Sequence, residues 1–252
     1  MKRFLLSIFL GLSFVALQAQ KPQHYYVEVK TDKGNILIQL YNETPKHRDN
    51  FKKLVSEGYY DSLLFHRVIK NFMIQGGDPD SKNAADNALL GNGGPEYKIS
   101  AEIQPNMIHR KGALGAARDN NPAKQSSASQ FYIVQGRIFT NQGLDSLEQF
   151  RLNGSKLSAI QREQYTTVGG APHLDGNYTV FGQVIRGIES VDSIATVKTN
   201  AQDRPIVNER MYMRLLTRRE AINQDRELSG LEPKSGFFTE LFDTFKSKKY
   251  SL

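Results

Sequence analysis

The residues Phe65–Asp78, which read FHRVIKNFMIQGGD, constrain this chain most, because they place one arginine in an apolar strand. An arginine in such a strand must meet hydrogen-bond acceptors or face a groove, since an unpaired buried charge is costly. At the alternating spacing of a strand, Arg67, Ile69 and Met73 share one side of a sheet. A fixed donor beside a sulfur and apolar side chains suits a ligand with an apolar ring and weak acceptors. A proline-containing peptide is such a ligand.

The first residues have the layout of a secretory signal peptide, 1–19. Lys2 and Arg3 precede an apolar run, Phe4–Leu17, and small residues follow as far as Ala19. This run is short for a membrane span, so we expect no integral membrane span and cleavage near Ala19. The sequence contains no cysteine and therefore no disulfide framework. These features predict a periplasmic or secreted bacterial protein.

The net charge of the chain is moderately positive, and it favours a solvated surface over one that binds a charged macromolecule. The net charge is +7, and loss of Lys2 and Arg3 with the leader leaves +5. Such a moderate excess is typical of a solvated basic surface and predicts no nucleic-acid partner. The five histidines show no close paired spacing, so the sequence predicts neither a metal site nor a cofactor. We expect a monomer.

Short alternating segments predict a mainly β fold. A hairpin spans Tyr25–Tyr41, and a helix begins after Thr44, with Pro45 in its first position, and ends at Gly58. A second helix is predicted over Gly187–Ala195. Further strands are predicted at Gly112–Ala117, Gln130–Val134, Tyr178–Val184 and near Met211–Leu216. Many short strands, two helices and long loops indicate a closed β-barrel with helices at its ends.

Two segments lie outside the β core of the predicted domain, which we place at residues 24–216. Residues from about 141 to 168 contain few β-forming side chains and predict a helical insertion. Residues 217–252 form a charged C-terminal extension that is predicted to be partly helical. In it, four apolar residues share one helical face, namely Phe238, Leu241, Phe242 and Phe245. That face either packs on the barrel, docks a partner or lies on a membrane surface.

Three stretches in a fixed order resemble the cyclophilin family of peptidyl-prolyl cis–trans isomerases. They are Phe65–Asp78, then GALGAARDNNPAKQSSASQFYI at Gly112–Ile133, then LDGNYTVFGQVIRGIESVD at Leu174–Asp192. With the opening hairpin and helix, the resemblance spans roughly Tyr25–Leu216. It implies a closed eight-stranded antiparallel barrel capped by two helices.

The resemblance also implies a set of site residues. Arg67 corresponds to the catalytic arginine, and Gln75 to the glutamine that holds substrate backbone and orients that arginine. The positions that match substrate-binding residues are Phe72, Met73, Ala117, Arg118, Gln130, Tyr132, Leu174 and Tyr178.

Three pocket positions depart from the family pattern. Tyr132 stands where the family has phenylalanine, and its hydroxyl needs a hydrogen-bond partner. Tyr178 stands where many eukaryotic members carry histidine. His173 replaces the tryptophan of cyclosporin-sensitive members, so we do not expect tight cyclosporin binding.

The resemblance predicts an isomerase that acts on X-Pro bonds of exported proteins and assists their folding, with Arg67 donating to the prolyl nitrogen. Proline-containing polypeptides are the expected partners. One alternative is a non-catalytic proline-peptide binding module or chaperone of the cell envelope. Another is an envelope scaffold that docks through the Phe238–Phe245 face.

Overall fold

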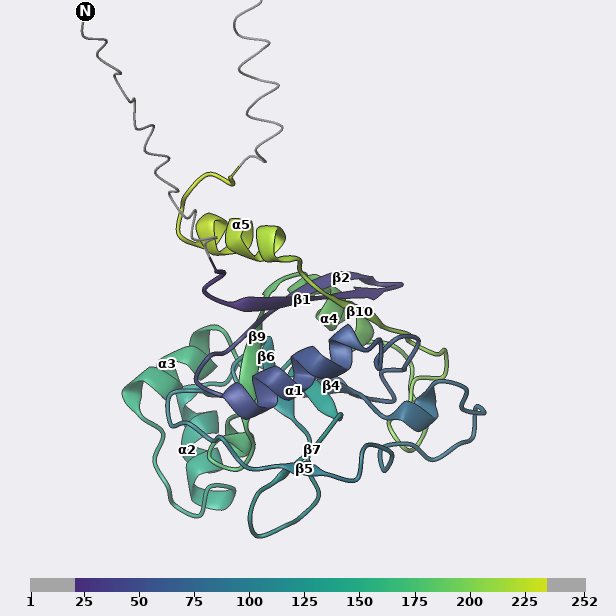
Figure 1. Cartoon of the computed structure of the whole chain (residues 1–252). Coiled ribbons are helices and arrows are strands. Elements are labelled where there is room, and N and C mark those ends of the chain that lie inside the picture. Colours follow the sequence, from purple (N-terminus) through teal and green to yellow (C-terminus); the bar gives the residue numbers. More distant parts are fainter. Residues whose placement is uncertain (1–20, 235–252) are drawn as a thin grey trace, which may run out of the picture.

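The computed structural model describes residues 21–234, and a curled eight-stranded sheet forms its centre (Figure 1). All neighbouring strands in this sheet are antiparallel. From one edge to the other the order is β10 (Tyr212–Leu215), β1 (Tyr25–Thr31), β2 (Gly34–Leu40), β9 (Val180–Arg186), β6 (Ala113–Ala116), β8 (Phe131–Val134), β4 (Met73–Gly76) and β3 (Arg67–Ile69). Two short strands, β5 (Lys98–Ile99) and β7 (Ser126–Ser127), pair separately.

The predicted closed barrel is wrong, because this sheet is open between β10 and β3. Irregular chain lies across the gap: Phe65 N–H donates to the Glu209 carbonyl at 2.9 Å, and an isolated bridge joins Leu64 to Arg210. Ser62 has φ 68°, which breaks the extended backbone, and β3 begins only at Arg67. The ladder therefore stops short of closure, and the fold is a curled half-barrel.

The described residues form five α-helices, where the sequence predicts two at the ends of the barrel and further helix in the segments at about 141–168 and 217–252. Two lie where the sequence predicts them, α1 (Pro45–Ser56) and α4 (Ile188–Ile194). The other three are α2 (Asn141–Phe150), α3 (Ala159–Thr167) and α5 (Arg218–Leu228). Thr44 precedes α1 as expected, but its side chain makes no capping bond. The carboxylate of Glu102 instead accepts from the N–H groups of Lys46 and His47, both at 3.0 Å, which satisfies free donors of the first turn.

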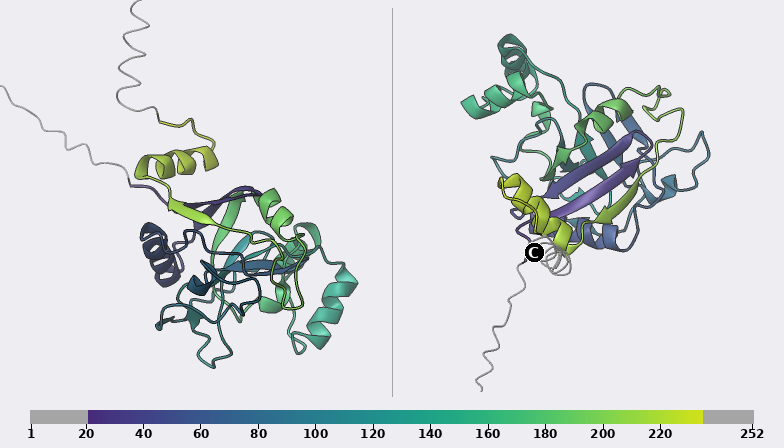
Figure 2. Two further views of the ribbon diagram at one scale, coloured as in Figure 1. Left: turned by 90° about the vertical axis from the view of Figure 1, so that its right-hand side faces the viewer. Right: turned by 90° about the horizontal axis from the view of Figure 1, so that it is seen from above.

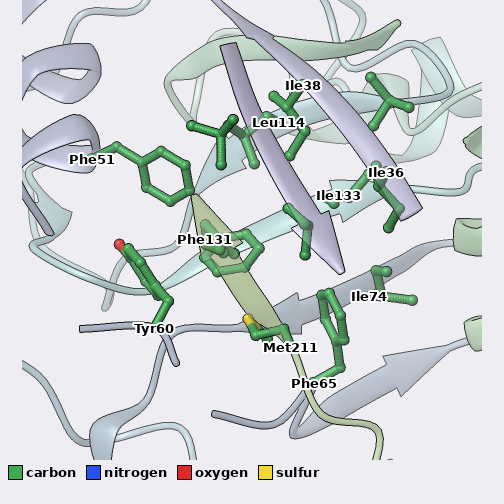
Figure 3. Close-up of a cluster of buried hydrophobic side chains, with 14 of the residues drawn as sticks. Ile36, Ile38, Phe51, Tyr60, Phe65, Ile74, Leu114, Phe131, Ile133 and Met211 are labelled. Carbon is green, nitrogen blue, oxygen red and sulfur yellow. The ribbon is translucent and has the colours of Figure 1, made fainter. Parts of the chain in front are cut away.

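The main hydrophobic core lies inside the curl of the sheet, against α1 and α4 (Figure 3). Phe131 and Ile133 of β8 point into it, together with Ile74 of β4. Their neighbours Tyr132 and Met73 belong to a second cluster on the other face. Because successive strand residues face opposite sides, β8 and β4 bury both of their faces. The second face is the one that carries the site.

The helices α2 and α3 form a lobe on one side of the sheet, and α5 lies on another, over β1 and β2 (Figures 1 and 2). The lobe has its own buried cluster, which includes Leu144 and Tyr165. Ala221 of α5 packs against Tyr26 and Leu37 on the outer side of the sheet. The predicted signal peptide and the Phe238–Phe245 face lie outside the described residues. Between residues 21 and 234, no helix has the length and apolar character that a membrane crossing requires.

Candidate active site

The β3–β4 hairpin sets Arg67 at the edge of a pocket. Arg67 lies directly opposite Gln75 in this antiparallel pair, so their side chains project on the same side. In the connecting turn, Asn71 has φ 63° and its N–H donates to the Gln135 side chain at 2.6 Å. The Phe72 carbonyl accepts from the Gln135 N–H at 3.0 Å. The turn of the hairpin, which includes Phe72, is thus hydrogen-bonded to Gln135, directly after β8.

Nine of the ten predicted site residues line one pocket of about 170 Å³. The pocket is built on the second apolar cluster, in which Met73, Tyr132 and Leu174 are buried. The lining residues are Arg67, Phe72, Met73, Gln75, Ala117, Arg118, Tyr132, Leu174 and Tyr178. Gln130, the tenth, lies in an adjoining hollow that shares Gln75, Ala117 and Arg118 with the pocket. The structure therefore brings the whole predicted set together.

Gly115 explains how the Tyr132 ring fits into the wall of the pocket. Gly115 of β6 lies opposite Tyr132 of β8. A Cβ atom at Gly115 would lie 2.3 Å from Cζ of Tyr132. The ring therefore lies over a strand position that has no side chain, and this placement depends on glycine.

A directed chain of amide hydrogen bonds holds Gln75 beside Arg67. Nε2 of Gln130 donates to the carbonyls of Gly91 and Gly93 at 2.8 and 2.9 Å. Oε1 of Gln130 then accepts from Nε2 of Gln75 at 3.1 Å. This leaves Oε1 of Gln75 to accept from Nη1 of Arg67 at 3.4 Å. The amide orientations follow from the network, because only one arrangement matches each donor with an acceptor.

Asp203 contacts Arg67 from the other side, and sequence reasoning did not find it. Its Oδ2 lies 3.6 Å from Nε of Arg67, and each side chain is 44% exposed. The Asp203 carbonyl also accepts from Val68 N–H at 2.8 Å, so the segment that carries Asp203 is hydrogen-bonded to β3. The guanidinium is thus held by two acceptors at the lip of the pocket, and within residues 21–234 its remaining N–H groups have no partner and can meet a ligand. No local pattern marks Asp203, which is far from β3 in sequence.

The side chain of Arg118 makes contacts within the protein, whereas its backbone groups are available for hydrogen bonds to a ligand. Its Nε donates to the Asn177 carbonyl at 3.0 Å, and its guanidinium lies over the Tyr178 ring at 4.7 Å. Across residues 21–234, nothing pairs with the backbone N–H or carbonyl of Arg118. These two groups lie next to the pocket and are available to an extended peptide, as the resemblance implies for this position.

A buried network connects the pocket to the α2–α3 insertion. Nε2 of His109 lies 2.9 Å from the Tyr132 hydroxyl, and Nδ1 lies 2.8 Å from Oδ1 of Asp175. A carboxylate accepts only, so Nδ1 carries the proton, and with a neutral imidazole the Tyr132 hydroxyl donates to Nε2. Asp175 also accepts from the hydroxyl of Tyr165 and, at 3.2 Å, from Gln161, both in α3. His109 is thus the partner that the Tyr132 hydroxyl required.

Burial shifts the pKa values of groups around the site. Desolvation raises the pKa of the Tyr132 phenol well above its usual value, so the hydroxyl keeps its proton. Desolvation, reinforced by nearby cations, lowers the pKa of His173, whose ring lies 5.1 Å from Phe72. His66 is only 3% exposed, and its ring nitrogens find no partner among residues 21–234. Burial lowers the pKa of His66 to about 4.

Ser126, His47 and Glu102 are connected like a nucleophile, base and acid, but they form a structural cluster. Nε2 of His47 lies 2.9 Å from Oγ of Ser126, and Nδ1 lies 2.7 Å from Glu102. Ser126 is 1% exposed, so a substrate carbonyl cannot approach its oxygen. The cluster instead joins the start of α1 to β7. In residues 21–234, no group of three or more His, Asp or Glu side chains is placed to hold a metal ion.

Comparison with known proteins agrees with this geometry. Residues 26–213 match the family model described as cyclophilin type peptidyl-prolyl cis-trans isomerase/CLD. A putative peptidyl-prolyl cis-trans isomerase of Staphylococcus haemolyticus is 35% identical over 181 residues, 71% of this chain and 85% of the relative. A putative bifunctional phosphatase/peptidyl-prolyl cis-trans isomerase of Streptococcus pyogenes is 34% identical over 197 residues, and the match covers 77% of this chain but only 39% of that longer protein.

A solved structure supports the fold independently. The crystal structure of a cyclophilin type peptidyl-prolyl cis-trans isomerase from Cryptosporidium parvum superimposes with a TM-score of 0.57 and 24% sequence identity. It covers 77% of this chain and 98% of its own.

Proposed function

This chain belongs to the cyclophilin-type peptidyl-prolyl cis–trans isomerases, and we propose that it catalyses rotation about X-Pro bonds at the pocket beside Arg67. The observation that carries the proposal is a cation held at the lip of a small apolar pocket. Gln75 and Asp203 hold the Arg67 guanidinium, while Met73 and Leu174 form buried parts of the pocket.

The chemistry requires no nucleophile. Resonance gives an amide C–N bond a rotational barrier of about 18–20 kcal/mol, and X-Pro bonds exchange over tens to hundreds of seconds. In the twisted transition state the prolyl nitrogen loses conjugation and becomes a better acceptor. A donor aimed at that nitrogen binds the transition state more strongly than the ground state, which is the condition for catalysis.

Arg67 is suited to this task because its guanidinium is always charged and has several fixed donors. The prolyl ring would lie against Phe72, Met73, Tyr132 and Leu174, while the carbonyl before it turns. The open main-chain groups of Arg118 would hold the substrate backbone. One directed hydrogen bond in a site without water supplies roughly 3–4 kcal/mol, and positioning of the ring and backbone accounts for further acceleration.

We further propose that the protein is exported and assists the folding of envelope proteins. The support is the leader-like composition of residues 1–19. Fractionation of cells that express the full chain tests export, and an uncleaved cytoplasmic product would contradict it.

The test of the enzymatic proposal is the cis–trans exchange rate of a short X-Pro peptide, measured with wild type, with Arg67→Ala and with buffer. We expect clear acceleration by wild type and a loss of about 100- to 1,000-fold in Arg67→Ala. A wild type that gives no acceleration over buffer contradicts the proposal. Equal protection of an unfolded client by both proteins would then favour the non-catalytic binding module.

A further inference from the structure

A second hollow lies beside the proline pocket, between the β3–β4 turn and helix α2 of the insertion. Its volume is about 590 Å³, which is in the range of ligand-binding clefts. Phe72 lines both hollows. The His173 ring, 5.1 Å from the Phe72 ring, stands beside it on the side of the second hollow. A peptide whose prolyl ring occupies the first pocket can therefore extend into the second.

One face of α2 forms a wall of this hollow. Gly143, Ser146, Leu147 and Phe150 all line it, and their spacing of i, i+3, i+4 and i+7 puts them on one helical stripe. The Phe150 ring is 75% exposed. An exposed aromatic side chain next to the small residues Gly143 and Ser146 leaves room for an apolar side chain of a ligand.

The charge of the hollow is entirely positive. Lys70, Arg137 and Arg151 line it, and its lining contains no aspartate or glutamate. None of these three cations forms an ion pair within residues 21–234. The nearest acids on α2 are already engaged, because Asp145 and Glu148 each lie 2.8 Å from a nitrogen of Arg162. The three cations of the hollow are therefore available to an acidic group of a ligand.

The insertion is held in place before any ligand binds. Arg162 of α3 joins Asp145 and Glu148 of α2, and Asp175 connects Gln161 and Tyr165 of α3 to the pocket wall through His109. A wall that is already ordered avoids the conformational cost of ordering on binding. The hollow is thus organised as a binding surface.

We propose that this hollow is a second substrate subsite, which takes an acidic residue and a neighbouring apolar residue of the same polypeptide, a few positions from the proline. This rests on the isomerase function proposed above. An extended chain lies across the two hollows in one direction, so the acidic residue acts on one flank of the proline only. The preference enters through binding and therefore lowers KM rather than raising kcat.

The test compares isomerisation of three kinds of peptide by the full chain. One is a neutral X-Pro tetrapeptide, and the others are longer peptides with Asp-Phe or Lys-Phe placed three residues before or after the proline. An exposed ion pair is worth about 1.4- to 5-fold in affinity, so with several cations we expect about tenfold higher kcat/KM for Asp-Phe than for Lys-Phe on one flank. That ratio falls toward one in 1 M salt, where the Debye length is about 3 Å.

Charge-reversal variants complete the test. Arg137→Glu/Arg151→Glu is expected to reverse the preference and to leave turnover of the tetrapeptide within about twofold. Lys30→Glu/Arg219→Glu, which changes two exposed cations elsewhere, makes the same change in net charge and is expected to keep the preference. If the double variant does not fold, Arg151→Glu alone is expected to reduce the preference about threefold.

Two outcomes overturn the subsite while the isomerase stands: no charge preference on either flank, or a preference that survives Arg137→Glu/Arg151→Glu. Failure of the tetrapeptide to exchange faster than in buffer contradicts the isomerase function itself. Binding of labelled Asp-Phe and Lys-Phe peptides by fluorescence anisotropy then still tests the hollow, and equal affinities overturn it.

Discussion

Replacing Tyr132 with phenylalanine removes one hydroxyl and leaves a buried histidine nitrogen without its donor. In the wild type this hydroxyl donates to Nε2 of His109 at 2.9 Å. The His109 side chain is fully buried, so no water takes the place of the lost donor. Because Nδ1 is bound to Asp175 at 2.8 Å, the ring cannot turn to offer its other nitrogen without breaking that contact.

The cost follows from the unsatisfied acceptor. A buried polar group that loses its partner costs about 1–3 kcal/mol of unfolding free energy. For a domain of this size, each 1 kcal/mol corresponds to a fall of about 2–4 °C in melting temperature. We therefore expect Tyr132→Phe to lower the midpoint by roughly 2–12 °C in calorimetry and to lower the unfolding free energy in urea, with an unchanged m value.

A double-mutant cycle with His109→Leu distinguishes the hydrogen bond from a packing effect. Each single variant leaves one unpaired polar group, whereas Tyr132→Phe/His109→Leu leaves neither. The double variant should therefore be more stable than the sum of the two single losses predicts, by about 1 kcal/mol or more. Additive losses, or a Tyr132→Phe protein as stable as wild type, would refute the proposed donor and acceptor roles.

Three other changes test separate parts of the structure. Folded His66 has a pKa of about 4 against 6.5 when unfolded, so stability falls as the pH drops from about 6.5 to about 4. The loss of unfolding free energy reaches about 3 kcal/mol. Urea unfolding of His66→Leu across this range should show a smaller loss, and a pH dependence equal to that of wild type would contradict the assignment to His66. Gly115→Ala displaces the Tyr132 ring, and we expect a loss of about 1–3 kcal/mol in unfolding free energy and weaker peptide binding by titration; wild-type values for both would disprove the close approach. Asp203→Ala frees one side of Arg67 and should lower kcat about three- to tenfold with little change in stability. Glu227→Ala, which removes an exposed ion pair of α5, should leave kcat unchanged. An equal kcat in the two variants would show that Asp203 does not position Arg67.

The sequence predicts those parts of the site that local pattern determines. The parity expected for a single strand places Arg67, Ile69 and Met73 on one side. The structure keeps them on one side through a hairpin that the sequence did not predict, whose register sets Arg67 opposite Gln75 and Ile69 opposite Met73. The family resemblance added residues from β8 and from the chain before β9, and the structure places them around the same pocket. Their individual roles in catalysis stay predictions.

Features that depend on contacts between distant segments were not predictable in this way. The Tyr132 hydroxyl evidently needed a partner, but nothing near it in sequence identifies His109. Asp203 reaches Arg67 only because the chain after α4 passes along the open edge of the sheet. Closure of the barrel depends on how the two edges meet, and there the chain before β3 is irregular, with a positive φ at Ser62. Counting strands does not reveal such a break.

The central claim is that Arg67 acts on the twisted transition state rather than on the bound peptide. NMR exchange spectroscopy on one X-Pro peptide gives both the catalysed exchange rate and, by titration, the dissociation constant for wild type and Arg67→Ala. We expect the exchange rate to fall about 100- to 1,000-fold, while the dissociation constant changes by less than about threefold. An exchange rate that is unchanged, or that falls only in proportion to binding, would contradict it.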